Sequence, residues 1–298
     1  MANLKEIRTR IESVSSTKQI TSAMKMVSAA KLRRAQDAIV RLRPYAEKLQ
    51  LILGSVSDSL KDDEDFIFAK ESKEINKVLL VVITSNRGLC GAFNANVFKK
   101  AIYVAHENYK AQLMKNNVDF FVMGKKADEF LRKRKYKVVK TRNDIFDQLS
   151  FNNVALIATG IMEQFASGEY DRIHLIYNQF KNAAVQILTE DQFLPVKITE
   201  KRDDEGNILK SFTDYIFEPS KREMVKELIP KSLKLQLYKA LLDSFASEQG
   251  ARMTAMHKAT DNATEMIKQY KLDYNKARQA SITNEILEIV GGANALKG

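Results

Sequence analysis

Residues 77–94, KVLLVVITSNRGLCGAFN, decide the class of fold. Their first nine residues form a short run rich in β-branched side chains, which is typical of a strand buried in a parallel sheet. A turn with two glycines follows, and the pattern after it predicts a helix from about Asn94 to Lys110. A strand, a turn and a helix in this order indicate an α/β domain.

The same alternation continues toward the C-terminus. We expect further helices and strands in turn: strands at 118–124, 136–140, 172–178 and 184–189, and helices at 125–134 and 152–166. This order predicts a central doubly wound, Rossmann-like α/β domain over residues 58–219. Within that range, residues 62–65 predict an acidic loop and residues 200–210 a hairpin turn.

Both ends of the chain predict long helices, because residues 1–43 contain neither Pro nor Gly and only Gly250 interrupts residues 231–290. Apolar residues recur at heptad spacing in both segments. The N-terminal repeat comprises Leu4, Ile7, Ile11, Val14, Ala35, Ala38, Leu42, Tyr45, Leu49, Ile52 and Val56. The C-terminal repeat comprises Leu235, Tyr238, Leu242, Phe245, Met256, Ala259, Ala263, Met266, Tyr270, Tyr274 and Ala277. Residues 1–57 and 220–298 therefore predict one long antiparallel coiled coil.

The N-terminal repeat is interrupted in its middle. Ile20, Met24 and Val27 lie on a stripe displaced from the heptad positions on either side. We therefore expect the seam of the coiled coil to slip at this point.

The chain carries a formal net charge of +11, and the excess lies at its two ends. Residues 1–57 hold 11 basic and 4 acidic side chains, residues 220–298 hold 13 and 9, and the residues between them are neutral overall. Nucleic acid, a lipid surface and an acidic protein surface are all partners that fit such an excess. Within the N-terminal segment, residues 18–43 hold seven basic residues and one acidic residue, a charge that fits a solvated helix face and nucleic-acid binding equally well. The lack of aromatic residues among these cations argues against nucleic acid.

No arrangement of residues indicates catalysis, a cofactor or a metal site. The turn at 85–94 fits neither Gly-rich phosphate-binding signature, and Cys90, with no base nearby in sequence, predicts a buried structural thiol. One cysteine and three scattered histidines predict neither an internal disulfide nor a zinc site. Acidic residues 203–205 favour a solvated turn over a cation site. No apolar run is long enough to span a membrane and the N-terminus resembles no leader, so we expect an unprocessed cytoplasmic protein.

The extreme C-terminus is apolar. Its apolar residues are Ile282, Ile286, Leu287, Ile289, Val290, Ala293, Ala295 and Leu296. A helix end that projects into water is normally polar, so this pattern favours insertion into a protein cavity over a frayed tail.

Four stretches of the sequence resemble the gamma subunit of bacterial F-type ATP synthases: residues 7–36, 85–94, 246–263 and 275–286. The resemblance implies a noncatalytic central shaft, present in one copy, that couples ion flow through a membrane ring of c subunits to conformational cycling of the beta-subunit catalytic sites. It implies the alpha3 beta3 hexamer, the epsilon subunit and the c-subunit ring as partners, with no nucleic acid and no cofactor. It also implies a peripheral location at the cytoplasmic face of the bacterial inner membrane.

The resemblance further implies roles for particular residues. Contacts with the beta subunit are implied for Met24, Lys25, Met26, Arg33, Arg34, Arg278, Gln279, Thr283 and Glu285. A tip that turns in an apolar sleeve is implied for Ile286, Ile289, Val290 and Leu296. A foot that faces the ring is implied for Tyr215, Phe217 and Glu218.

Overall fold

The computed structural model describes residues 4–56, 67–69, 72, 74–196 and 220–295. The chain divides into two compact units: residues up to Ala29 together with those from Arg252 onward, and residues Ala30–Ala251. The acidic loop expected at 62–65 and the hairpin turn expected at 200–210 lie outside the described residues.

The second unit contains a five-stranded sheet in the order β3-β2-β1-β4-β5. Its strands are β1 (Val78–Ile83), β2 (Val118–Met123), β3 (Val138–Thr141), β4 (Arg172–Phe180) and β5 (Gln186–Leu194). The first four are parallel, with Val78 paired to Val118 on one side and to Arg172 on the other. All six residues of β1 are buried, as expected for the central strand of a parallel sheet.

The last strand is longer than expected and runs antiparallel to its neighbour. β5 runs antiparallel to β4, with Tyr177 opposite Thr189, and it extends to Leu194 rather than ending at Thr189. A short connection from β4 can only reverse the chain, because a parallel neighbour requires a crossover of a dozen or more residues.

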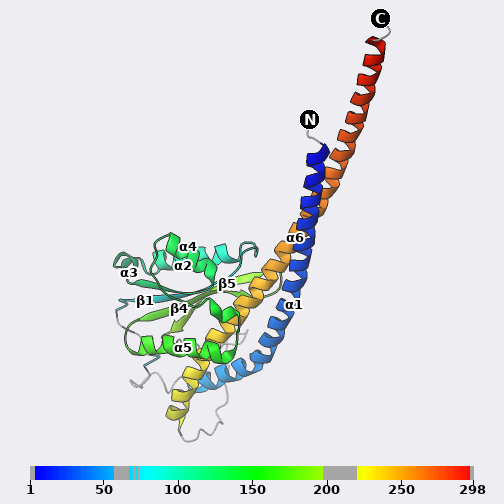
Figure 1. Cartoon of the computed structure of the whole chain (residues 1–298). Helices are drawn as coiled ribbons and strands as arrows, with labels where there is room; N and C mark the ends of the chain where they lie inside the picture. The colour runs from blue at the N-terminus through cyan, green and yellow to red at the C-terminus, as the bar shows by residue number, and fades with distance from the viewer. Residues whose placement is uncertain (1–3, 57–66, 70–71, 73, 197–219, 296–298) are drawn as a thin grey trace, which may run out of the picture. The chain divides into compact units, whose positions relative to one another are not determined.

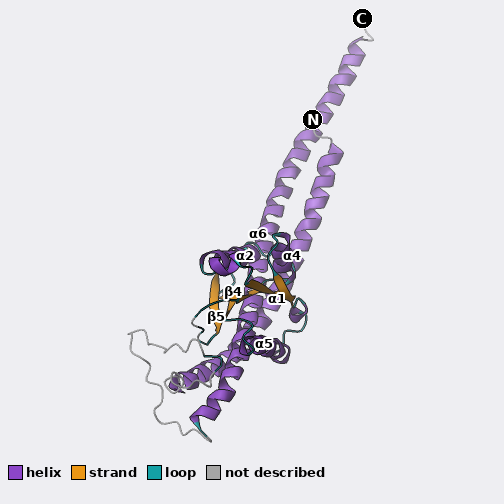
Figure 2. Ribbon diagram, turned by 90° about the vertical axis from the view of Figure 1, so that its left-hand side faces the viewer, coloured by secondary structure: helices purple, strands orange, loops and turns teal. Residues whose placement is uncertain are grey.

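Helices cover both faces of this sheet (Figure 1, Figure 2). They are α2 (Phe93–Glu107), α3 (Lys110–Met114), α4 (Lys125–Lys133) and α5 (Phe151–Ala166), with a 3-10 turn at Asp144–Phe146. α2 and α4 bury apolar residues such as Val97 and Leu131 against one face. α5 buries Ile157 and Ile161 against the other. The doubly wound arrangement is therefore confirmed.

The helix expected over 94–110 is two helices, because Tyr109 leaves the helical conformation. Its φ is −132° and its ψ is 34°, and its side chain is buried with the hydroxyl 2.5 Å from Nε2 of His174 in β4. This tertiary contact outweighs the local helical pattern, which has no means of indicating it.

The two longest helices are α1 (Leu4–Val56) and α6 (Lys221–Ala295), each with one internal proline, Pro44 and Pro230. In the second unit, α6 packs Ile229, Leu233 and Leu237 into the core beneath α5. Over the described residues, no helix combines the length and the apolar character that a membrane span needs.

In the first unit, α1 and α6 form the expected antiparallel pair. The Thr260 hydroxyl donates to the Thr21 hydroxyl at 2.9 Å, and Nζ of Lys25 lies 3.4 Å from Nδ1 of His257. A step forward along α1 therefore matches a step backward along α6, as in an antiparallel coiled coil.

The expected slip of the seam in α1 is wrong. Burial continues the first heptad frame without a break, at Lys18, Thr21, Lys25 and Ser28 and then Leu32 and Ala35. Ile20 and Val27 are instead exposed on the outer surface, and Met24 is half-buried. Polar residues fill the inner positions here, and the apolar residues Ile20 and Val27 lie on the outer face of the helix.

The pattern in α6 needs a similar correction. Met266 is exposed, and the neighbouring Ile267 is the more buried of the two. Met256 and Ala263 are buried as expected.

Candidate partner-contact surface

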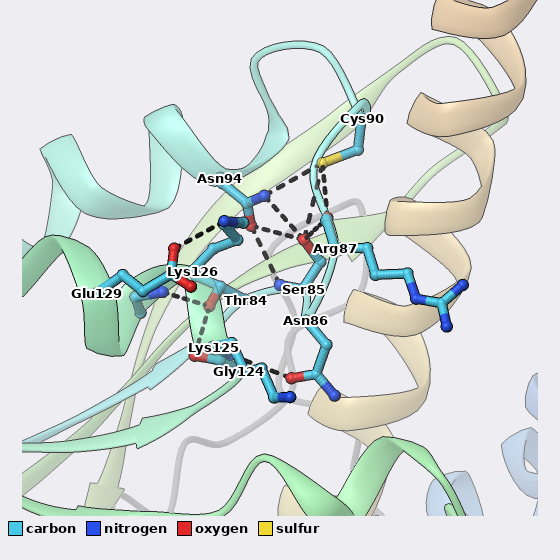
Figure 3. Close-up of polar contacts among 11 residues, drawn as sticks. Thr84, Ser85, Asn86, Arg87, Cys90, Asn94, Gly124, Lys125, Lys126 and Glu129 are labelled. Atoms are coloured by element: carbon cyan, nitrogen blue, oxygen red, sulfur yellow. Dashed lines mark hydrogen bonds and ion pairs between the residues drawn. The ribbon is translucent and has the colours of Figure 1, made fainter.

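The turn after β1 occupies the place where α/β proteins often bind phosphate, and its polar groups bond to one another (Figure 3). The Ser85 backbone N–H donates to Oδ1 of Asn94 at 3.1 Å, and Nδ2 of Asn94 donates to the Ser85 hydroxyl oxygen at 2.8 Å. The Ser85 hydroxyl donates to the Arg87 carbonyl at 2.6 Å. Cys90 is buried, with its sulfur 3.2 Å from Nδ2 of Asn94. The Asn94 amide thus serves to close this turn.

Glycine is needed at two positions beside this turn. Gly91 has a φ of +59°, and Gly124 has a φ of +116°. A Cβ at Gly124 would lie 2.2 Å from the Thr84 carbonyl oxygen, so the backbones of β1 and the β2–α4 connection approach more closely than any side chain allows (Figure 3). Gly88 has neither a positive φ nor a crowded Cβ position.

The residues expected to contact the beta subunit lie on the two long helices, and most of them are exposed. In α1, Met26 is 65% exposed, and Arg33 and Arg34 are also exposed. Lys25 is half-buried because it sits at a seam position beside His257. In α6, the four expected contacts are all exposed: Arg278, Gln279, Thr283 and Glu285.

The C-terminal part of α6 has no helical neighbour among the described residues. The Thr21–Thr260 contact places Leu4, where the described part of α1 begins, level with about Ala277. α6 continues to Ala295, which adds about 27 Å at about 1.5 Å per residue. Ile286, Ile289 and Val290 are 55%, 70% and 50% exposed there.

Four expected contact residues lie outside the described residues. These are the tip residue Leu296 and the foot residues Tyr215, Phe217 and Glu218.

A buried polar segment of α6 was not identified as functional from the sequence. Its buried members are Asp243, Ser244, Ser247, Glu248, Gln249 and Arg252. Within the second unit, the Ser247 hydroxyl donates to the Asn178 carbonyl of β4 at 3.0 Å. The C-terminal repeat has no member between Phe245 and Met256, and this gap was the available signal, because polar residues on a helix that stays buried require polar partners.

Asp243 is the titratable group most affected by this burial. Burial raises the pKa of its carboxyl to about 6, while Lys239 and Arg43 act to lower the pKa and Asp191 acts to raise it. The neighbouring Tyr177 hydroxyl donates to Asp191 at 2.8 Å.

Comparison with known proteins covers the whole chain. The family model described as ATP synthase matches residues 3–296. The ATP synthase gamma chains of Christiangramia forsetii and Flavobacterium johnsoniae are 59% and 60% identical to it over 298 residues, covering 100% of each chain. Among solved structures, a chain of the Euglena gracilis mitochondrial ATP synthase rotor is 25% identical, with a TM-score of 0.66, covering 94% of this chain and 98% of that one. A chain of the Tetrahymena thermophila mitochondrial ATP synthase central stalk and c-ring structure is 28% identical, with a TM-score of 0.57, covering 80% and 99%.

Proposed function

Because the chain belongs to the family of ATP synthase gamma chains, we propose that it is the central rotating shaft of the enzyme. It couples ion flow through the c-subunit ring to the conformational cycling of the catalytic sites on the beta subunits. Its partners are the alpha3 beta3 hexamer, the epsilon subunit and the c-ring, and one copy serves each complex. The chain is noncatalytic, since the ATP chemistry belongs to the beta subunits.

The single observation that carries this proposal is the helix pair of the first unit. α1 and α6 form an antiparallel pair with exposed residues along both outer sides, and α6 continues alone into an exposed apolar end. A shaft of this kind presents a different surface to each of three surrounding sites. Unequal contacts of this sort are what a conformational shift requires, because a binding partner biases an equilibrium only by its differential interaction with the states.

We assign the lower contacts with the beta subunit to Met24, Lys25, Met26, Arg33 and Arg34. The exposed guanidinium groups suit an acidic loop, for which charge complementarity provides orientation and speed of association. Lys25 differs from the arginines because its Nζ lies 3.4 Å from Nδ1 of His257. A carboxylate oxygen of Asp261 also lies 3.4 Å from that Nδ1.

The upper contacts and the tip occupy the unaccompanied part of α6. Arg278, Gln279, Thr283 and Glu285 would meet loops of the beta subunit, and Ile286, Ile289, Val290 and Leu296 would turn in an apolar sleeve. The exposed apolar residues of this segment support the sleeve, because leaving such side chains in water forgoes about 25 cal/mol for each Å² that could be buried.

The foot and the location of the complex complete the proposal. Tyr215, Phe217 and Glu218, just before α6, would face the c-ring. The chain would thus lie at the cytoplasmic face of the bacterial inner membrane, held peripherally through the complex.

Reconstitution with purified alpha and beta subunits tests the shaft. The full-length chain should co-purify with them and restore ATP hydrolysis. Failure to associate, together with DNA binding that weakens steeply with salt, would instead favour a nucleic-acid-binding coiled coil.

A charge reversal tests the residue assignment. Lys25→Glu should lower ion pumping per ATP hydrolysed in membrane vesicles more than it lowers the stability of the chain, because this half-buried lysine is assigned to a contact with the beta subunit. Lys110→Glu, at an exposed position in α3, is the matched control. Unchanged pumping by Lys25→Glu would remove this residue from the contact.

A further inference from the structure

The segment 125–142 is strongly basic although the middle of the chain is neutral overall. It contains nine basic and two acidic residues, and it forms α4, the turn after it and the edge strand β3. The charge is therefore concentrated at one edge of the sheet.

Four of these nine cations have carboxylate partners close by. Lys126 pairs with Glu129 at 2.7 Å and Arg132 with Asp128 at 2.6 Å. Lys137 reaches the buried Asp119 at 2.8 Å, and Arg142 reaches Asp144 at 2.9 Å. These ion pairs stabilise the local fold. They also neutralise most of the charge of the four cations, which leaves little of it to attract a partner.

The other five cations are exposed and form no ion pair with a described residue: Lys125, Lys133, Arg134, Lys135 and Lys140. We call them the α4–β3 basic surface. Five like charges this close in sequence repel one another, so a fold that keeps them together without carboxylates favours an anionic partner.

Aromatic contacts disfavour single-stranded nucleic acid as that partner. Phe130 stacks on Phe98 with ring centroids 4.2 Å apart, and the Arg134 guanidinium lies 4.2 Å from the Phe130 ring centroid. Both faces of the Phe130 ring are thus used within the chain, whereas nucleic-acid surfaces of this kind need aromatic faces open for base stacking.

The position of α4 in the second unit disfavours a lipid surface. α4 covers the face of the sheet opposite α5 and the first turns of α6 (Figure 1). The proposed foot residues immediately precede α6 in the sequence, so the proposed function assigns the ring to the side of the sheet where α6 begins. The basic surface is therefore on the side of the sheet away from the proposed ring and its membrane.

We propose that the α4–β3 basic surface docks an acidic protein surface of the assembled complex, separately from the contacts along the helix pair. This inference rests on the proposed function, because the proposed foot contacts define which side of the second unit faces the ring. Exposed ion pairs hold this contact, so it is strong at low salt and weakened at high salt.

Carbodiimide coupling tests the contact in the purified complex, because it joins a lysine directly to a carboxylate that touches it. Lys125, Lys133 and Lys135 should couple to Asp or Glu residues of another subunit, which mass spectrometry of the linked peptides identifies. The yield should fall about fivefold or more between 0.05 and 0.5 M salt, since the screening length shrinks to about 4 Å.

A charge-reversal variant provides a second measurement. The side chains of Lys125, Lys133 and Lys135 are exposed and form no ion pair with a described residue, so Lys125→Glu/Lys133→Glu/Lys135→Glu should fold normally. At low salt it should assemble with the alpha, beta and epsilon subunits about tenfold more weakly than the parent chain. The control is Lys110→Glu/Lys115→Glu/Lys181→Glu, which changes the net charge equally at exposed positions elsewhere and should bind within about twofold of the parent chain.

Three results would overturn the inference. One is an absence of links from these lysines to other subunits in a complex that assembles normally. Another is an equal loss of binding in both triple variants, which would show an effect of net charge alone. The third is protection of these lysines only in vesicles containing phosphatidylglycerol, which would assign the surface to lipid. A parent chain that fails to assemble would instead refute the proposed function.

Discussion

Replacing Asp243 by Asn should stabilise the chain at neutral pH and remove the loss of stability that ionisation of this carboxyl causes between pH 4 and 7. Asp243 lies in α6 at 4% exposure, and burial is the largest cause of its raised pKa of about 6. Asn has nearly the same shape as the protonated carboxyl but cannot ionise. The substitution therefore tests whether the buried, ionised carboxylate of Asp243 destabilises the folded chain.

The sign follows from proton binding. In the unfolded chain the carboxyl has its ordinary pKa of 3.8, so the folded chain, with the higher pKa, holds the proton more tightly. The contribution of Asp243 to the free energy of unfolding is therefore highest below pH 4, falls as the pH rises to about 6, and levels off above it. A difference of about two pKa units corresponds to about 3 kcal/mol. Asp243→Asn should exceed the parent chain by up to about 3 kcal/mol at pH 7.5 and match it at pH 4.

Urea unfolding of the full-length chain, followed by near-ultraviolet circular dichroism of its tyrosines, measures this difference at each pH. Asp261→Asn, at an exposed carboxylate of the same helix, is the control and should change the unfolding free energy little at any pH. If Asp243→Asn were as stable as the parent chain at pH 7.5, or less stable, Lys239 and Arg43 would outweigh burial and the reasoning would be refuted.

Three further substitutions test the packing. Gly124→Ala should cost about 3 to 5 kcal/mol, because its Cβ would lie 2.2 Å from the Thr84 carbonyl oxygen at a φ of +116°; an unchanged urea midpoint would contradict this. Leu237→Ala should cost about 2 to 5 kcal/mol in the same assay, because Leu237 is fully buried in the core beneath α5, and a loss below about 1 kcal/mol would indicate that the core refills the space. Thr260→Val should cost about 1 kcal/mol in thermal melts by leaving the Thr21 hydroxyl without its 2.9 Å partner in the seam, whereas Thr21→Val/Thr260→Val should recover most of this loss.

The strongest local patterns predicted the elements that the structure contains. The run of β-branched residues at β1 and the helix α5 were located to within a residue or two. α5 begins at a Ser150 side chain that accepts from the Asn153 N–H, a local capping contact that its sequence specifies. Where neighbours in the chain determine the conformation, the sequence was sufficient.

The partner-contact residues were predicted through the resemblance rather than through chemistry. Met26, Arg33 and Arg34 are exposed as a contact requires, yet nothing in their spacing distinguishes them from an ordinary solvated face. The proximity of His257 to Lys25 joins residues 232 positions apart, and no local pattern indicates it.

By itself, the sequence determined that two heptad-bearing ends flank an α/β domain, because helix and strand periodicities are properties of neighbouring residues. Only the tertiary structure decided which face of each long helix is inside. In α1 the inner positions include Thr21 and Ser28 while Ile20 and Val27 face outward, and in α6 the polar segment around Asp243 is buried. A polar residue is stable inside when a partner from a distant segment satisfies it, and the position of that partner is fixed only once the chain has folded.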